Sequence, residues 1–149
     1  MLPELKVLLL SAVPLVEMKG GIPLGVHLGL PIVEACILGI LGTCLQIPFN
    51  LLLAEWLVRL AGRNRHAARF LEWSRHRSIK HQRTVNRLGF LGVAILVGIP
   101  IPGTGLWTGT MAGYALGLSR FSLVLGLVVG TAVAGVLVGL ATAGIWHFL

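Results

Sequence analysis

The sequence predicts an all-α integral membrane protein, in which an inverted repeat pairs a re-entrant hairpin with a transmembrane helix in each half. The chain has 149 residues, of which 56% are hydrophobic and only 11% charged, and its mean hydropathy is +0.90. A soluble domain carries about 25% charged residues. In each half, an apolar stretch broken by Pro and Gly precedes a longer apolar stretch. Paired broken segments of this kind are typical of secondary transporters.

The first broken stretch, residues 14–23, carries Glu17 and Lys19 between apolar flanks. A charge at membrane depth costs several kcal/mol on insertion scales, so this pair is a candidate functional site. Prolines remove backbone donors, and the pair Gly20 and Gly21 permits unusual dihedrals. We therefore expect the helix to break throughout this stretch, with glycine amides and the Lys19 ammonium available to an anion at a helix start. The alternative is a surface loop with a local ion pair, which such apolar flanks disfavour.

The second broken stretch, residues 100–109, is rich in Pro, Gly and Thr. Its glycines add backbone amides, its threonines add hydroxyls, and its tryptophan adds an amphipathic wall with an indole donor. We expect a substrate to contact Gly103, Thr104, Gly105, Trp107 and Thr108. Anchoring at the membrane interface is the alternative role for Trp107.

Short apolar arms flank both breaks: residues 4–13 and 24–30 around the first, and 88–99 and 111–118 around the second. Ten helical residues extend about 15 Å, which is half of the ~30 Å hydrocarbon core. Each pair of arms should therefore form a re-entrant hairpin. A full-length span with an internal break is the alternative.

Two longer stretches can cross a membrane: the twenty uncharged residues between Glu34 and Glu55, and residues 121–146. Pro48 should kink the first of these helices. Three polar residues fall on one face of that helix, and they either form a helix packing face or line a cavity facing Glu17. These residues are Thr43, Gln46 and Asn50.

The last apolar stretch has small residues at regular spacing. Gly126 and Gly130, and likewise Gly135 and Gly139, are four residues apart. This spacing permits close helix approach, either inside the protein or at the seam of a homodimer.

Nine of the twelve Lys and Arg residues lie between Arg59 and Arg87. We expect residues 59–87 to be cytoplasmic by the positive-inside tendency, both termini to lie outside, and the protein to be a multi-pass protein of the cell (inner) membrane. Residues 62–87 should form a basic amphipathic helix in contact with membrane lipids. Nucleic acid is not an expected partner, because the basic residues adjoin membrane spans.

No metal or cofactor is expected, apart from H⁺ or Na⁺ as a coupling ion. His66, His76 and His81 have no neighbouring Cys or Asp and should be solvated. Cys36 and Cys44 are about 12 Å apart along a helix, too far for a disulfide. No removable signal peptide is visible.

The two halves align without gaps at an offset of 88 residues, with ten identities over the 58 positions 4–61. The matches include Pro14 with Pro102 and the pair 42–43 with 130–131. We therefore predict one membrane domain, residues 1–149, made of a first repeat (about 4–61), the basic segment (62–87) and a second repeat (about 88–149). A hairpin followed by one crossing inverts the second repeat relative to the first.

Residues 16–25 and 100–109 resemble the two signature stretches of the putative small multidrug export protein family, and the resemblance covers nearly the whole chain. That family is similar in outline to DedA-type membrane proteins, which have two re-entrant loops and include lipid-carrier flippases. The chain is shorter than the DedA pattern and contains no Asp. The resemblance implies a membrane transport function.

The main functional hypothesis is an ion-coupled transporter or flippase for a small amphipathic substrate bearing a phosphate. In this hypothesis Lys19 and the loop amides hold the anion, and Glu17 carries the coupling ion. One alternative is a proton-coupled exporter of lipophilic cations, in which Glu17 binds the cation or the proton. Another is a non-transporting membrane scaffold. An enzyme is not expected, because no nucleophile–base set is visible.

Overall fold

The computed structural model describes residues 2–14, 16–63, 69, 82–101 and 105–148, and its regular elements in these ranges are all helices. The prediction of an all-α chain is therefore confirmed for this part of the protein. Most of the predicted amphipathic helix at residues 62–87, with His66, His76 and His81, lies outside the described residues.

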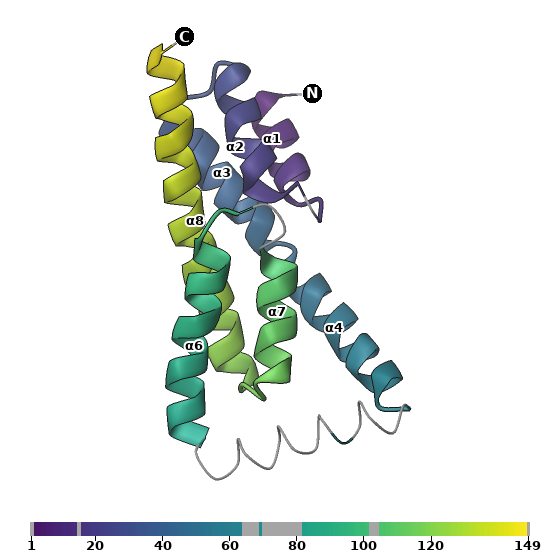
Figure 1. Cartoon of the computed structure of the whole chain (residues 1–149). Coiled ribbons are helices and arrows are strands. Elements are labelled where there is room, and N and C mark those ends of the chain that lie inside the picture. The colour runs from purple at the N-terminus through teal and green to yellow at the C-terminus, as the bar shows by residue number, and fades with distance from the viewer. Residues whose placement is uncertain (1, 15, 64–68, 70–81, 102–104, 149) are drawn as a thin grey trace.

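The N-terminal half begins with two short helices, α1 (Pro3–Ser11) and α2 (Glu17–His27), which pack side by side as a hairpin. It continues with α3 (Ile32–Cys44) and α4 (Ile47–Ala61), which together run from one end of the molecule to the other (Figure 1). Both α1 and α2 pack against α3, so the hairpin covers only the half of the molecule that α3 occupies.

The C-terminal half has the same order of elements. Helices α6 (Gln82–Gly98) and α7 (Leu106–Ala115) form a second hairpin, and α8 (Arg120–Phe148) runs the full length of the molecule. Figure 1 shows the two hairpins approaching from opposite ends, with both of their turns near the middle. The two breaks in the sequence are therefore brought to the same level of the fold.

The interruption between α3 and α4 lies directly before Pro48, which is the second residue of α4. The amide of Gln46 bonds to Thr43 O, three residues back, and regular helix resumes when Asn50 N bonds to Gln46 O. A proline cannot donate to the carbonyl four residues before it, so the helix bends here. The predicted kink is confirmed.

The first break is shorter than predicted. The described residues 12–14 and 16 lie between the helices, and α2 already begins at Glu17, so Gly20, Gly21 and Pro23 are all helical. The expectation of a non-helical backbone through residue 23 was wrong. Pro23 is an exposed residue inside α2, and it cannot donate a hydrogen bond to the carbonyl four residues before it. In the second half, too, the helix after the break begins earlier than predicted, at Leu106. Helix α6 begins at Gln82, inside the predicted basic segment.

Matching turns end the two hairpins. Gly29 and Gly117, 88 residues apart, both have positive φ, at 89° and 66°. Around them the same hydrogen bonds recur, with Leu30 N donating to Gly25 O and Leu118 N donating to Gly113 O, both at 3.0 Å. This is the left-handed glycine ending of a helix, in which a side chain would strain the backbone.

The regularly spaced glycines of α8 pack inside the protein. A Cβ at Gly130 would lie 2.8 Å from Ala94 O on α6, and Gly126 faces α6 in the same way. Gly135 and Gly139 face α3 instead. Internal packing therefore accounts for all four glycines, and a homodimer stays a prediction.

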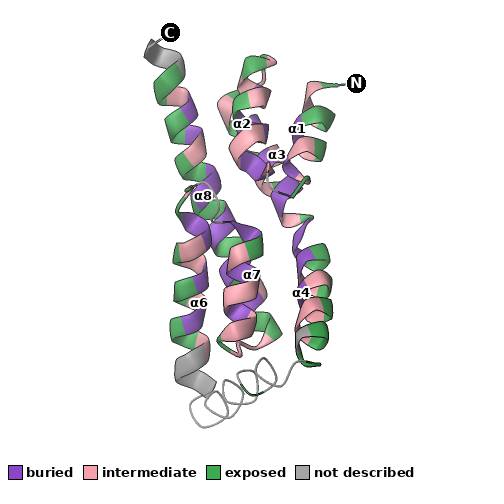
Figure 2. Ribbon diagram, turned by 45° about the vertical axis from the view of Figure 1, so that its right-hand side comes forward, coloured by how far each residue is buried: buried purple, intermediate pink, exposed green. Residues whose placement is uncertain are grey.

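Many large hydrophobic side chains are exposed on the outer faces of α3, α4 and α8; Figure 2 marks which parts of the helices are exposed. Leu52, Trp56, Phe121 and Leu140 are each more than half exposed. Two helical stretches, Ile32–Leu60 with 29 residues and Arg120–Ile145 with 26, are long and apolar enough to cross a membrane. At about 1.5 Å per residue both exceed a ~30 Å hydrocarbon core. Both stretches therefore fit membrane-spanning helices by length and composition.

Candidate functional site at the meeting of the two hairpins

Glu17 begins α2 and is only 7% exposed. Its φ is +50°, and no other non-glycine residue among those described has a positive φ. The left-handed region costs an L-residue roughly 1–2 kcal/mol, so the surrounding contacts must hold Glu17 in place. A strained residue that carries a buried carboxylate is a strong candidate for function.

The carboxylate of Glu17 reaches across to the other half of the chain. Its Oε1 accepts a hydrogen bond of 3.1 Å from the backbone amide of Leu106, the first residue of α7. Glu17 therefore lies at the N-termini of both α2 and α7, where the helix dipoles favour negative charge. The interaction joins residues 89 positions apart and connects the two hairpins.

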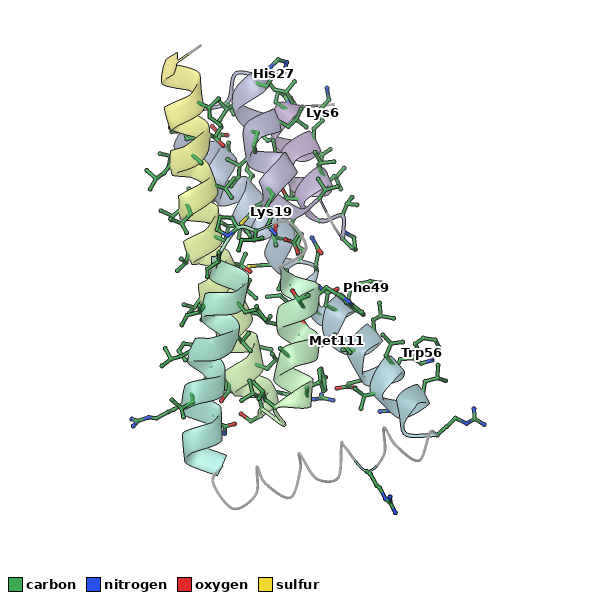
Figure 3. All side chains as sticks on the ribbon, in the orientation of Figure 1. Lys6, Lys19, His27, Phe49, Trp56 and Met111 are labelled. Atoms are coloured by element: carbon green, nitrogen blue, oxygen red, sulfur yellow. The ribbon has the colours of Figure 1, made fainter. Side chains whose placement is uncertain are left out.

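Lys19 completes the link between the halves. Its Nζ lies 3.6 Å from Glu17 Oε2 and donates a 3.1 Å hydrogen bond to Ile101 O, on the connection between α6 and α7. Figure 3 shows Lys19 at the level where that connection crosses the molecule. The Glu17 side chain is 9% exposed and the Lys19 side chain 24%, so the pair is largely shielded from solvent. Breaking such a pair leaves an uncompensated charge, which is costly at low dielectric.

Gly105 makes the close approach possible. A Cβ there would lie 2.5 Å from Glu17 Oε1 and 2.7 Å from Oε2, closer than a carbon can stand to an oxygen. Only glycine allows the start of α7 to approach the carboxylate this closely. The predicted contact of Gly105 with a substrate stays a prediction.

Polar side chains from α3 hold the first turn in position. The Oγ1 of Thr43 accepts 2.9 Å from Met18 N and donates to Ser11 O, while Gln46 Nε2 donates 2.6 Å to the same carbonyl. Thr43, Gln46 and Asn50 are 0%, 4% and 3% exposed. The predicted polar face therefore does face the Glu17 turn, but Thr43 and Gln46 are occupied in bonding its backbone. Their predicted contact with a cavity stays a prediction.

The glycine pair after Lys19 does not offer amides to a ligand in this structure. The amide of Gly20 bonds to Val16 O at 3.3 Å. Gly21 is buried against α1, where a Cβ would collide with the Ser11 hydroxyl. The expectation of an exposed glycine loop was wrong because the helix starts three residues before the pair. Gly21 instead lets α1 and α2 pack closely.

The predicted site residues of the second break differ in their surroundings. The Thr108 hydroxyl accepts from Gly105 N at 2.9 Å and donates to Gly105 O at 3.0 Å, which caps the start of α7. Trp107 is 38% exposed and lies beside this capped turn. Gly103 and Thr104 lie outside the described residues.

Residue type and local pattern did not identify two groups of this site. One is the amide of Leu106, whose residue type carries no signal because any residue supplies an amide. The other is the buried hydroxyl of Thr131, which the internal alignment matches with Thr43. That alignment was the available signal. No group of three or more His, Cys, Asp or Glu side chains suited to a metal ion occurs in the described ranges.

The fold and the site together define a class: a small helical membrane protein whose halves meet at a buried carboxylate–ammonium pair. A sequence profile described as "Putative small multi-drug export protein" matches residues 17–137, most of the chain. The chain belongs to this family, and the match begins at Glu17 itself. Neither the curated proteins nor the solved structures gave a match.

Proposed function

We propose that the protein is an ion-coupled exporter of small amphipathic substrates, with Glu17 as the coupling carboxylate. The observation that carries the proposal is the bond from Leu106 N to Glu17 Oε1. One titratable side chain of the first half holds the first turn of a helix in the second half. A proton or Na⁺ that takes the carboxylate would weaken this bond, so ion binding and separation of the hairpins would be coupled.

The surroundings of Glu17 favour a cationic over an anionic substrate. The Lys19 ammonium faces Glu17 at 3.6 Å and donates to Ile101 O, so an anion would have to compete with both partners. A lipophilic cation would need only the Glu17 carboxylate, and it could replace Lys19 as the partner of that carboxylate. Export of lipophilic cations, the alternative raised from sequence, is therefore our first proposal and agrees with the family description. A phosphate-bearing substrate is the second, supported by the presence of the ammonium.

We also infer that the halves form an inverted repeat with re-entrant hairpins, from which alternating access follows. The glycine turns at Gly29 and Gly117 match at the offset of 88 residues. The hairpins approach from opposite ends and are too short to cross a ~30 Å core alone. The connection between α1 and α2 would then meet the connection between α6 and α7 near the bilayer midplane, where the substrate sites of such transporters lie. Membrane lipids would contact the exposed apolar faces.

The proposal predicts a topology. With hairpins that return to the side they enter from, residues 59–87 are cytoplasmic and both termini are external. A cysteine at Ser78, in a background lacking Cys36 and Cys44, should be labelled by an impermeant maleimide only after the cells are opened. Labelling from outside sealed cells would contradict this orientation.

The function is tested with purified protein in liposomes under an imposed pH or Na⁺ gradient. A lipophilic cation such as tetraphenylphosphonium should move against its gradient and should compete with the coupling ion. A short-chain polyprenyl phosphate is the comparison substrate. Transport of the phosphate alone would favour the flippase hypothesis, and transport of neither would favour a scaffold.

A further inference from the structure

Thr131 is buried in α8 without a hydrogen bond. Its exposed fraction is 0%, and its Oγ1 is one of three buried side-chain atoms without a partner in the described part of the chain. Threonines inside helices commonly bond back to the carbonyl four residues earlier, as Thr110 and Thr142 do here, at 2.6 and 2.8 Å. Thr131 does not do so. A buried hydroxyl without a hydrogen-bond partner costs free energy, so the missing partner of Thr131 needs an explanation.

The internal alignment identifies what this hydroxyl lacks. In the first half, Thr43 Oγ1 accepts the amide of Met18, in the first turn of α2, at 2.9 Å. The offset of 88 residues maps Met18 to Leu106 and Thr43 to Thr131. The amide of Leu106, however, donates to Glu17 Oε1 instead. The second half is therefore missing one bond that the first half makes, and Glu17 has taken its donor.

Helix register places Thr131 at the level of this amide. Along the antiparallel pair α7 and α8, Gly113 approaches Leu123, and a Cβ at Gly109 would lie 3.1 Å from Leu127. One more turn on both helices brings the start of α7 to Thr131. The first half has the equivalent sequence of contacts, since a Cβ at Gly25 would lie 2.9 Å from Ala35. Two turns further along both helices lies the bonded pair Met18 and Thr43.

We propose that Thr131 is a positioning residue of the coupling cycle, and that its hydroxyl is the alternate acceptor of the Leu106 amide when Glu17 withdraws to bind its ion. This inference rests on the proposed function, because it takes ion binding at Glu17 as the event that releases the amide. Lys19 is the charged group paired with Glu17, and the neighbouring side chains from α1 and α3, Ser11, Thr43 and Gln46, are uncharged. The exchange keeps the first turn of α7 bonded in both states.

The test is amide hydrogen exchange of Leu106, measured in the full chain without substrate. It shows whether the amide changes from one acceptor to the other. In Glu17→Ala the carboxylate is gone, and the Leu106 amide should stay protected through Thr131. In Glu17→Ala with Thr131→Val, which keeps the shape, its exchange should be at least about tenfold faster. Thr131→Ser should restore protection, and Thr142→Val, on the same helix, is the matched control that should change nothing.

Equal exchange of the Leu106 amide in Glu17→Ala and in its Thr131→Val double variant would overturn the inference. If Glu17→Ala does not fold, Glu17→Leu, which keeps the bulk of the side chain and has no acceptor, replaces it in both arms. The Thr131→Val double variant should again exchange at least about tenfold faster, and equal rates would overturn the inference. Because no transport is measured, a failure of the proposed function would show in the liposome assay and not here.

Discussion

Replacing Glu17 by Gln should abolish ion-coupled transport while leaving the protein folded. The amide keeps the size of the side chain and an oxygen that can accept the Leu106 amide, but it loses the charge that pairs with Lys19 and binds the ion. A charge-assisted interaction is worth up to about 3 kcal/mol, so ion occupancy should fall by about a hundredfold. The measurement is substrate movement in liposomes under an imposed ion gradient, across a pH series.

Glu34→Gln is the matched control, since Glu34 is an exposed carboxylate in the first turn of α3. It should leave both rate and pH dependence unchanged. Full, pH-dependent transport by Glu17→Gln would remove Glu17 from the coupling role. Loss of folded protein in that variant would instead indicate that the pair with Lys19 serves mainly to hold the hairpins together.

Composition and pattern predicted much of this fold. Low charge, two long apolar stretches and two Pro/Gly interruptions predicted helices, their order and the kink before Pro48, because each depends on local sequence. The limits of the first break were predicted less well. Gly20, Gly21 and Pro23 have low helix propensity, yet packing of α2 on α1 and α3 outweighs it.

The site too was predicted only in part, because the local sequence identifies the charged pair but not its partners. A charged pair in an apolar segment pointed directly to Glu17 and Lys19. Their partners could not be predicted from residue type, because Leu106 and Ile101 contribute backbone atoms. That Lys19 faces Glu17 rather than a ligand depends on where two distant turns meet, which local patterns do not encode. The internal alignment was the one long-range signal, and it is also what singles out Thr131.

Gly105→Ala should separate the hairpins and impair transport more than the same change at any open glycine. Its Cβ would stand 3.0 Å from Glu17 Cδ and closer still to both carboxylate oxygens, so the start of α7 or the carboxylate must move. The obstructed atoms are the end of the Glu17 side chain, so the carboxylate should turn away from Leu106 N; loss of that charge-assisted bond, about 1.5–3 kcal/mol, is enough to lower transport about tenfold or more. The measurement is the transport rate together with crosslinking between cysteines at Met18 and Thr104, in a background without the native cysteines.

The control must be a glycine whose Cβ would meet nothing. Gly126 is unsuitable, because a Cβ there would lie 3.1 Å from Phe90 O. Gly92, exposed on α6, has no atom within 4 Å of that position, so Gly92→Ala should transport and crosslink like wild type. In Gly105→Ala both the transport rate and the yield with a short crosslinker should fall together, because both depend on contact between the turns. If Gly105→Ala keeps full transport while its crosslinking falls, transport does not need contact between the two turns. The proposed coupling through Leu106 would then be wrong.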